Sequence, residues 1–268
     1  MWMYVAALSV MVALSVSLCT NIMIHGGTTA LNIAMAVVAV LTVCAEVVYF
    51  ARVMFLVNGR PMKWNIMRCA KLAVCYIVTM FVCSLVFTFV SYGVVMVKQP
   101  ATVAELQPVL TAFSVLYLVV YLLLIPCVYV AMEYMMEPEV KLRKTVFKSY
   151  LTGLRHWGFL FIALLIAALC AAVCSALVSI PALIVTAANI ISVLGVNFLG
   201  DPTGLPSYFN VLQFVVYAIS SFICLYINIF VVFVCYFLYG SIKTGEKEKS
   251  EFKSRDALAL TENVSEVK

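Results

Sequence analysis

Six apolar stretches of this sequence are long enough, or nearly so, to cross a lipid bilayer as helices. They are Trp2–Ile24, Leu31–Ala45, Leu72–Val97, Val109–Met132, Phe159–Leu194 and Val211–Tyr239. A helix needs about 20 residues to cross roughly 30 Å of hydrocarbon, and the second stretch reaches that length only if Val47–Val57 continues it past Glu46. The pattern predicts an all-α fold, a polytopic membrane helical bundle over residues 1–239 with about six transmembrane helices. The expected spans are about 2–24, 31–57, 72–97, 109–132, 159–180 and 211–239.

The composition agrees with this fold class. Hydrophobic residues make up 65% of the chain and charged residues 11%, whereas an average soluble domain is about 45–50% apolar and about 25% charged. So few charges could not cover the surface of a water-soluble globule. The composition therefore excludes a soluble enzyme, a disordered chain and a nucleic-acid-binding domain, and it makes the lipid bilayer the expected partner.

The cations are distributed unevenly between the two ends of the predicted spans. Of 17 Lys and Arg residues, all but Lys98 fall near the connection between spans two and three, near the connection between spans four and five, or in the C-terminal tail. Basic residues are enriched in cytoplasmic loops. We therefore expect both termini to be cytoplasmic, and the net charge of +5 indicates orientation before it indicates a partner.

The connection between spans four and five has the pattern of an amphipathic helix. Between Lys141 and His156 the apolar residues trace one helical face, and Lys141, Lys144, Lys148 and Arg155 occupy the remainder. This pattern predicts a helix in the cytoplasmic interface whose four cations contact anionic lipid headgroups. The alternative is a connecting helix that carries the ordinary cations of a cytoplasmic loop.

The fifth stretch is too long for one simple span. Dividing it into two spans would place the basic tail outside, so we expect a span from Phe159 to about Ile180 and a break at Pro181. Residues 181–194 are then predicted to form an external or re-entrant helix. Residues 240–268 have six cations, six acids and few apolar residues, which predicts a flexible cytoplasmic tail.

Residues that could perform catalysis are scarce. Nine of the ten cysteines lie inside predicted spans, and neither a CxxC pair nor a Cys/His metal spacing occurs. The sequence also lacks HExxH, GxSxG, P-loop and GxGxxG motifs. We therefore expect no catalytic, cofactor-binding or metal-binding residues and no cofactor, although a lipid-handling enzyme stays open as an alternative.

Glu46 is the one acid predicted to lie inside a span. A charged group in a span normally faces the bundle or a wet cavity because burial in hydrocarbon is costly. One hypothesis makes Glu46 a proton or cation relay. The other places it close enough to the cytoplasmic end to reach water.

Two stripes of residues at helical spacing suggest packing or a cavity. Small residues recur every fourth position in span five, at Ala163, Ala167, Ala171, Ser175 and Ser179. They predict a close helix–helix seam, within the chain or between protomers of a homo- or hetero-oligomer. Polar residues recur along the last span, at Gln213, Tyr217, Ser220, Ser221, Cys224 and Asn228. Such a stripe either hydrogen-bonds to neighbouring helices or lines a cavity along which a substrate moves.

Two segments of the second half carry a resemblance. They are Phe147–Leu160, which includes Gly153-Leu154-Arg155-His156-Trp157-Gly158, and Phe237-Leu238-Tyr239-Gly240-Ser241. They resemble segments of uncharacterised multi-pass membrane proteins of Bacteroidetes bacteria, which are similar to the membrane domain attached to some glycerophosphodiester phosphodiesterases. The resemblance implies a bacterial inner membrane location and brings no catalytic residue with it.

Three functions are consistent with these observations. The first is a membrane scaffold or partner-binding component without catalytic machinery. The second is a small transporter or channel that uses Glu46 and the polar stripe of the last span. The third is the lipid-handling enzyme, for which the basic interfacial helix is the only support.

Overall fold

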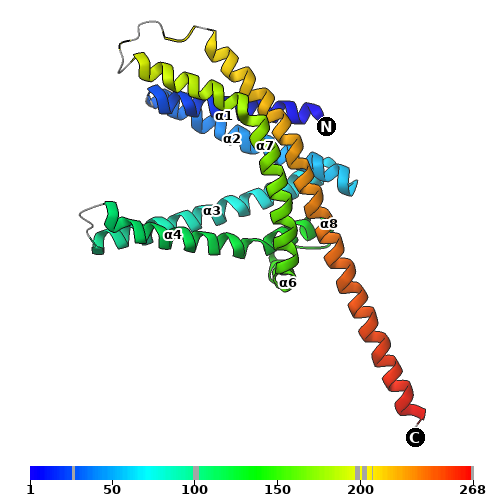
Figure 1. Cartoon of the computed structure of the whole chain (residues 1–268). Helices are drawn as coiled ribbons and strands as arrows, with labels where there is room; N and C mark the ends of the chain where they lie inside the picture. Colours follow the sequence, from blue (N-terminus) through cyan, green and yellow to red (C-terminus); the bar gives the residue numbers. More distant parts are fainter. Residues whose placement is uncertain (26–27, 99–102, 197–199, 201–203, 207, 267–268) are drawn as a thin grey trace. The chain divides into compact units, whose positions relative to one another are not determined.

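The computed structural model describes residues 1–25, 28–98, 103–196, 200, 204–206 and 208–266, and over these residues the fold is all-α (Figure 1). The helices, in chain order, are α1 (Trp2–His25), α2 (Thr29–Asn58), α3 (Met62–Lys98), α4 (Val103–Leu124), α5 (Pro126–Met136), α6 (Leu142–Arg155), α7 (Trp157–Leu194) and α8 (Phe209–Glu266).

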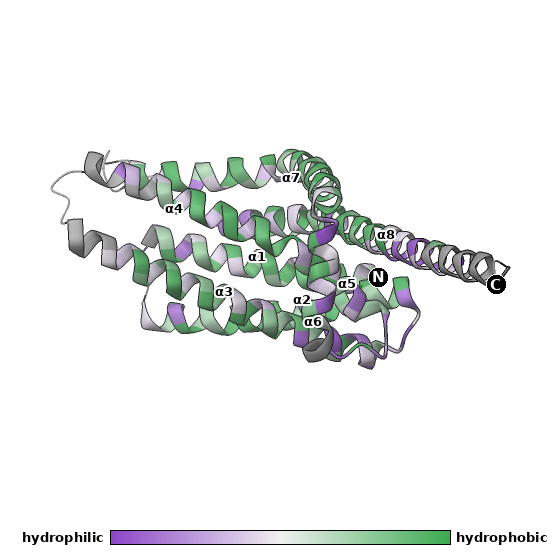
Figure 2. Ribbon diagram, turned by 90° about the horizontal axis from the view of Figure 1, so that it is seen from below, coloured by the Kyte–Doolittle hydropathy of each residue, from purple (hydrophilic) through white to green (hydrophobic). Residues whose placement is uncertain are grey.

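Within the described part of the chain, six segments are long and apolar enough to cross a membrane. They are Trp2–Met23, Thr29–Asn58, Met62–Gly93, Thr111–Met136, Trp157–Val196 and Phe209–Phe252. The hydropathy colouring in Figure 2 follows the same division, because the long helices are mostly hydrophobic, while hydrophilic residues appear on α8 where its apolar part ends. The predicted fold class, an all-α bundle with six membrane-spanning helices and further helices, is confirmed.

The chain divides into two compact units, which are described separately. Unit 1 comprises Met1–Phe113 and Ala168–Val231, and unit 2 comprises Ser114–Ala167 and Val232–Lys268.

In unit 1, α1 and α2 form a helical hairpin. The Thr28 side chain caps α2 by accepting a hydrogen bond from the Leu31 N–H, as N-cap threonines do. The hydroxyls of Ser15 and Thr42 are 3.0 Å apart and join the two helices. The end of α2 is also capped, because Gly59 adopts a left-handed φ of 64° and its N–H bonds to Phe55 O.

The helix α3 starts at Met62, earlier than the predicted start near Leu72. Its first turns are held against the end of α2. Asn65 is fully buried and exchanges hydrogen bonds with Asn58, and the guanidinium groups of Arg60 and Arg68 lie 5.2 and 4.2 Å from the Trp64 ring centroid. These contacts extend the helix through a basic segment that hydropathy alone assigned to a connection.

In unit 2, the predicted span 109–132 is two helices, because Pro126 separates α4 from α5. Proline has no N–H, so Leu122 O loses the donor that a residue four positions on would supply in a regular helix. Side chains from the following helices supply donors. Trp157 Nε1 donates to Leu122 O at 3.0 Å, and the Tyr150 hydroxyl donates to Leu123 O at 2.9 Å.

The amphipathic helix predicted between Lys141 and His156 is α6. It packs on α5 through Gly153, where an added Cβ would lie only 3.0 Å from Pro126 O. Ser149 on the same side of α6 is also buried. A side chain at this position would require the neighbouring Pro126 to shift by a few tenths of an ångström, so Gly153 favours the close approach of the two helices.

Two boundaries differ from the sequence-based expectation. Helix α7 continues through Pro181 to Leu194, so residues 181–194 extend the fifth helix. Helix α8 continues to Glu266, so residues 240–266 of the predicted flexible tail are helical, and whether this segment is flexible stays a prediction. Pairs one turn apart, Lys249 with Glu246 at 3.8 Å and Lys247 with Glu251 at 3.9 Å, stabilise a helix that the last span has already nucleated.

Candidate functional site

A groove in unit 1 is lined by side chains of three membrane-spanning helices. Its volume is about 360 Å³. We call it the polar groove, and its lining residues are Val12 and Val16 of α1; Ser179, Ala182, Leu183 and Thr186 of α7; and Tyr217, Ser220, Ser221, Cys224, Leu225 and Asn228 of α8. The polar stripe predicted on the last span therefore faces a groove over most of its length.

The N-terminal part of the stripe is internally hydrogen-bonded. Asn189 Nδ2 donates to Gln213 Oε1 at 2.9 Å, and Gln213 Nε2 donates to the Tyr217 hydroxyl at 2.7 Å. The hydroxyls of Tyr217 and Thr186 are 2.6 Å apart. Thr186 Oγ1 donates to Ala182 O, so Tyr217 must be the donor to Thr186. Gln213 and Tyr217 are buried and join α8 to α7, as polar side chains in membrane helices often do.

The C-terminal part of the stripe is less completely bonded. Ser220 Oγ donates to Val178 O at 3.3 Å, and Asn228 Nδ2 donates to Cys224 O at 3.1 Å. The Ser179 hydroxyl and the Cys224 thiol are 3.9 Å apart, at the limit of a hydrogen bond. Among the described residues, no partner bonds the Ser221 hydroxyl or Asn228 Oδ1. These groups keep hydrogen-bonding capacity toward the groove.

Glu46 does not line the polar groove. It is exposed on α2, one turn before Tyr49, whose hydroxyl donates to Leu225 O at 2.7 Å. The structure thus does not bring the candidate relay residue together with the polar stripe.

The small-residue seam lies on the inward side of α7. Ala167 and Ala171 are buried, while Ala163, Ser175 and Ser179 are half-buried. Within unit 1 the seam meets α8, because Ser179 contacts Cys224 and Val178 O accepts the bond from Ser220. Whether the seam also joins protomers stays a prediction.

The predicted headgroup contacts on α6 are mostly exposed. Lys141, Lys148 and Arg155 are exposed, and the Lys144 side chain lies outside the described residues. Phe147, Leu151 and Leu154 are also exposed, with Phe147 at 75%. Because residues three or four apart share a helix face, these three form an apolar strip beside the basic residues. That arrangement suits a bilayer interface.

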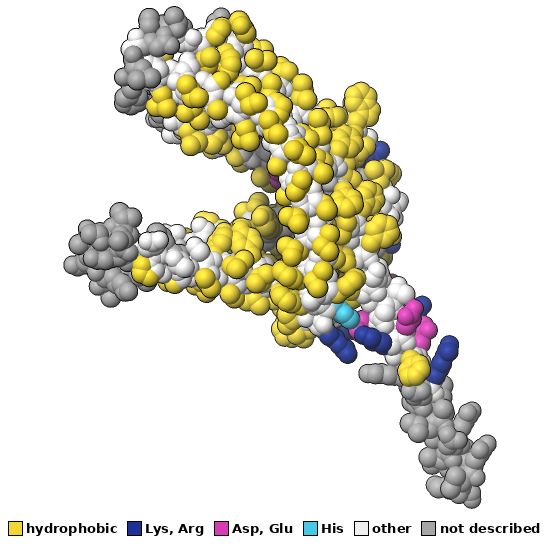
Figure 3. Space-filling view, viewed as in Figure 1, with side chains coloured by type: hydrophobic (Ala, Val, Ile, Leu, Met, Phe, Trp, Pro, Cys, Tyr) yellow, Lys and Arg dark blue, Asp and Glu magenta, His cyan; other side chains and the backbone are white. Residues whose placement is uncertain are grey.

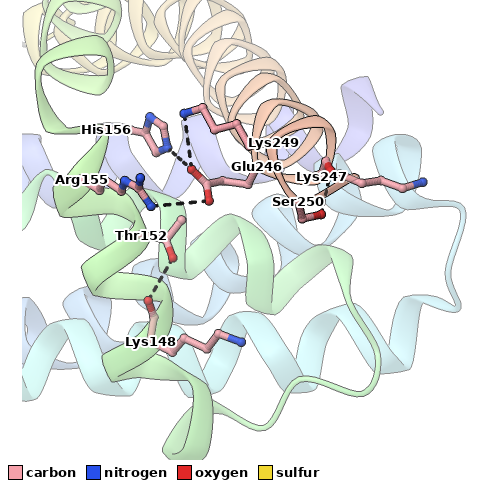
Figure 4. Close-up of polar contacts among 8 residues, drawn as sticks. All are labelled: Lys148, Thr152, Arg155, His156, Glu246, Lys247, Lys249 and Ser250. Carbon is pink, nitrogen blue, oxygen red and sulfur yellow. Dashed lines mark hydrogen bonds and ion pairs between the residues drawn. The ribbon is translucent and has the colours of Figure 1, made fainter. Parts of the chain in front are cut away.

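A charged cluster in unit 2 joins the α6–α7 junction to α8 (Figure 4). Glu246 Oε1 lies 2.9 Å from His156 Nε2, and Glu246 Oε2 lies 3.9 Å from an Arg155 nitrogen. In Figure 3, the visible charged side chains of unit 2 gather around this part of α8, while hydrophobic side chains cover its other helices.

A second contact joins α8 to the end of α5. The Tyr239 hydroxyl donates to Glu137 Oε1 at 2.7 Å, and the Lys243 ammonium forms an ion pair with the same oxygen. Partial burial raises the pKa of Glu137, but the hydrogen bonds from Lys243 and Tyr239 lower it by more, so its net pKa is below the usual value.

Across the end of the predicted last span, α8 carries a second groove. Its volume is about 510 Å³, and its lining residues are Tyr236, Phe237, Gly240, Ser241, Thr244, Gly245 and Glu248. We call this the arm groove, and the helical arm is Gly240–Phe252. Phe237, one of the lining residues of the arm groove, is exposed.

Sequence reasoning missed the partners of the sites it selected. Thr186 and Asn189 are three residues apart in the apolar α7. They could have been predicted to bond to another helix, because two polar residues on one face of a span need hydrogen-bond partners. Tyr239, Lys243 and Glu246 share one face of α8 and could have been read as a helical contact surface. The acceptor at Glu137 had no such signal.

Among the described residues, no group of three or more His, Cys, Asp or Glu side chains is placed to hold a metal ion. In comparisons with known proteins, no protein-family model, no curated protein and no solved structure matches this chain.

Proposed function

We propose that the protein is a membrane scaffold that binds a helical partner at the arm groove. In this proposal the six spans anchor it in a bacterial inner membrane, both termini are cytoplasmic, and the helical arm extends into the cytoplasm. The inner membrane location follows the resemblance, and the orientation follows the distribution of Lys and Arg.

The observation that carries the proposal is the attachment of the arm at its base. Glu137 bonds Tyr239 and Lys243, and Glu246 bonds His156 and Arg155. Two separate contacts hold the first two turns of the arm in one place. A surface ordered before binding loses less conformational entropy when a partner docks.

The arm groove has the surface chemistry of a helix-docking site. Gly240, Ser241, Thr244 and Gly245 leave space for the close approach of another backbone. Phe237 and Phe252 are exposed, Phe252 at 66%, and exposed aromatic side chains are frequent anchors of protein interfaces. The expected partner is an apolar or amphipathic helix, from another membrane protein or from a second copy of this chain.

Photo-cross-linking in native membranes tests this proposal. A photoreactive amino acid at Ser241, inside the arm groove, should give a discrete cross-linked product. The same amino acid at Ser250 should give none, because Ser250 is nine residues on and faces about the opposite side of α8. Adding Gly245→Leu, which fills the groove, should remove the Ser241 product. Equal products at Ser241 and Ser250, or a Ser241 product unchanged by Gly245→Leu, would contradict the proposal.

A small transporter is the second candidate function, because the polar groove places hydrogen-bonding groups among three of the predicted spans. Glu46 lies outside that groove, so its role as a relay needs a test of its own. If Glu46 is its relay, wild-type protein in liposomes should dissipate an imposed pH gradient, measured with a trapped dye, and Glu46→Gln should not. Equal rates for the two proteins would exclude the relay.

A further inference from the structure

We propose that the polar groove binds an uncharged glycerolipid of the diacylglycerol class. This inference is independent of the scaffold function, because the polar groove lies in unit 1 among α1, α7 and α8, whereas the arm groove lies on α8 of unit 2.

The position of the polar groove within the predicted spans favours a lipid over a water-soluble solute as its ligand. From Tyr217 to Asn228 the stripe extends eleven residues within the predicted last span, about 16 Å along the helix. Its walls include Val12, Val16 and Leu183. The volume of about 360 Å³ is within the usual range for a small-molecule site. A ligand there needs apolar surface against these walls and polar atoms against the α8 stripe.

The uncharged lining of the polar groove favours an uncharged ligand. None of the described residues that line the groove is Asp, Glu, Lys, Arg or His. A phosphate group in this position would have no cation to offset its loss of hydration, which is costly within a membrane. Ordinary phospholipid headgroups are therefore poor occupants.

The unbonded Ser221 hydroxyl and Asn228 Oδ1 require a ligand that has both a hydrogen-bond acceptor and a hydrogen-bond donor. The Ser221 hydroxyl can donate, so the ligand should offer a carbonyl or ether oxygen. Asn228 Oδ1 can only accept, so the ligand should offer a hydroxyl. A diacylglycerol has one hydroxyl and two ester carbonyls next to apolar chains. It therefore supplies both complements and can lay its chains along the valine and leucine walls.

Photolabelling in nanodiscs tests the proposal with the full-length protein. The probe is a diacylglycerol with a photoreactive group and an alkyne handle, in discs of uncharged phosphatidylcholine. Label on wild-type protein should map to peptides of α1, α7 or α8 that line the groove. Unlabelled dioleoylglycerol should displace it, while dioleoylphosphatidylglycerol, and a fatty-acid methyl ester that lacks a hydroxyl, should not.

Substitutions give the second arm of the test. Ser221→Ala and Asn228→Leu should each reduce groove labelling about fivefold, the effect of one lost hydrogen bond of about 1 kcal/mol. The matched control is Ser84→Ala, at an exposed serine of α3 outside the groove, which should label as wild type does. If the groove variants do not fold, the competition experiment on the wild-type protein decides alone.

Three results would overturn the proposal. One is label spread over all exposed helices without displacement, as expected for bulk lipid. Another is displacement by phosphatidylglycerol as effective as by dioleoylglycerol. The third is groove labelling that is the same in folded Ser221→Ala and Asn228→Leu proteins as in the wild type.

Discussion

At the scale of single residues, the position of a proline decides which backbone groups form hydrogen bonds. Pro126 and Pro181 are both prolines within apolar stretches, but Pro126 separates two helices while Pro181 stays inside α7. Next to Pro126, Trp157 donates to Leu122 O, the carbonyl that loses its helical donor, and Tyr150 donates to the neighbouring Leu123 O. The sequence places both prolines, but it does not indicate which side chains from later helices bond to the carbonyls.

Tyr217 is the residue on which the bonds between α7 and α8 depend most. Its hydroxyl accepts from Gln213 and donates to Thr186, and the ring is only 4% exposed. Tyr217→Phe removes both bonds and leaves Gln213 with an unmatched donor, so we expect a loss of about 1 kcal/mol of unfolding free energy. Unfolding of the purified protein in mixed micelles with increasing SDS measures this change.

The matched control for Tyr217→Phe is Tyr226→Phe. Tyr226 lies on the same helix but is 40% exposed and outside the polar groove. We expect its unfolding midpoint to equal that of the wild type. If Tyr217→Phe and Tyr226→Phe had the same unfolding midpoint, the Tyr217 hydroxyl would contribute nothing to the stability of the protein.

At the scale of elements, the packing of α6 on α5 depends on one glycine. A Cβ at Gly153 would lie 3.0 Å from Pro126 O and 3.1 Å from Pro126 Cβ, so Gly153→Ala should force α6 away from α5. We expect a destabilisation of about 1–3 kcal/mol, measured by thermal unfolding. Gly158→Ala is the control, since nothing lies within 4 Å of its Cβ position, and it should leave the midpoint unchanged or slightly higher. An unchanged unfolding midpoint for Gly153→Ala would contradict the close contact between α6 and α5.

The attachment of α8 to α5 should depend on pH. The net pKa of Glu137 is lowered in the folded protein, so its bonds to Tyr239 and Lys243 stabilise the fold above the usual glutamate pKa of about 4.3 and are lost as pH falls through the lowered value. Glu137→Gln should therefore have a lower melting temperature than wild type at pH 7. That difference should shrink as pH falls through the lowered pKa of Glu137, because the protonated acid then resembles glutamine.

Melting curves from pH 3.5 to 8 measure the effect. Glu139→Gln, at an exposed acid two residues on, serves as control and should differ little from wild type across the range. A Glu137→Gln difference that is constant with pH would mean that the charge of Glu137 does not stabilise the attachment.

At the scale of the whole molecule, hydropathy predicted the six spans, because crossing hydrocarbon requires long apolar helices. The pattern of α6 was also readable, since one face must be apolar. The helical arm could not be predicted from the sequence. Its balanced charges are as typical of an irregular tail as of a helix held by Glu137 and Glu246. The polar stripe was visible on α8, but the groove required Val12, Ser179 and Thr186 from other helices, whose approach no local pattern encodes.

The orientation of the molecule connects these scales, because with a cytoplasmic N-terminus the proposed cytoplasmic arm requires an even number of membrane crossings. Reporter fusions test this most directly. We predict that green fluorescent protein fused after Lys268 fluoresces and that alkaline phosphatase at the same position is inactive. Phosphatase fused after Lys98, in a connection expected to be external, should be active. Active phosphatase after Lys268 would contradict the six-span orientation and the proposed role of the arm.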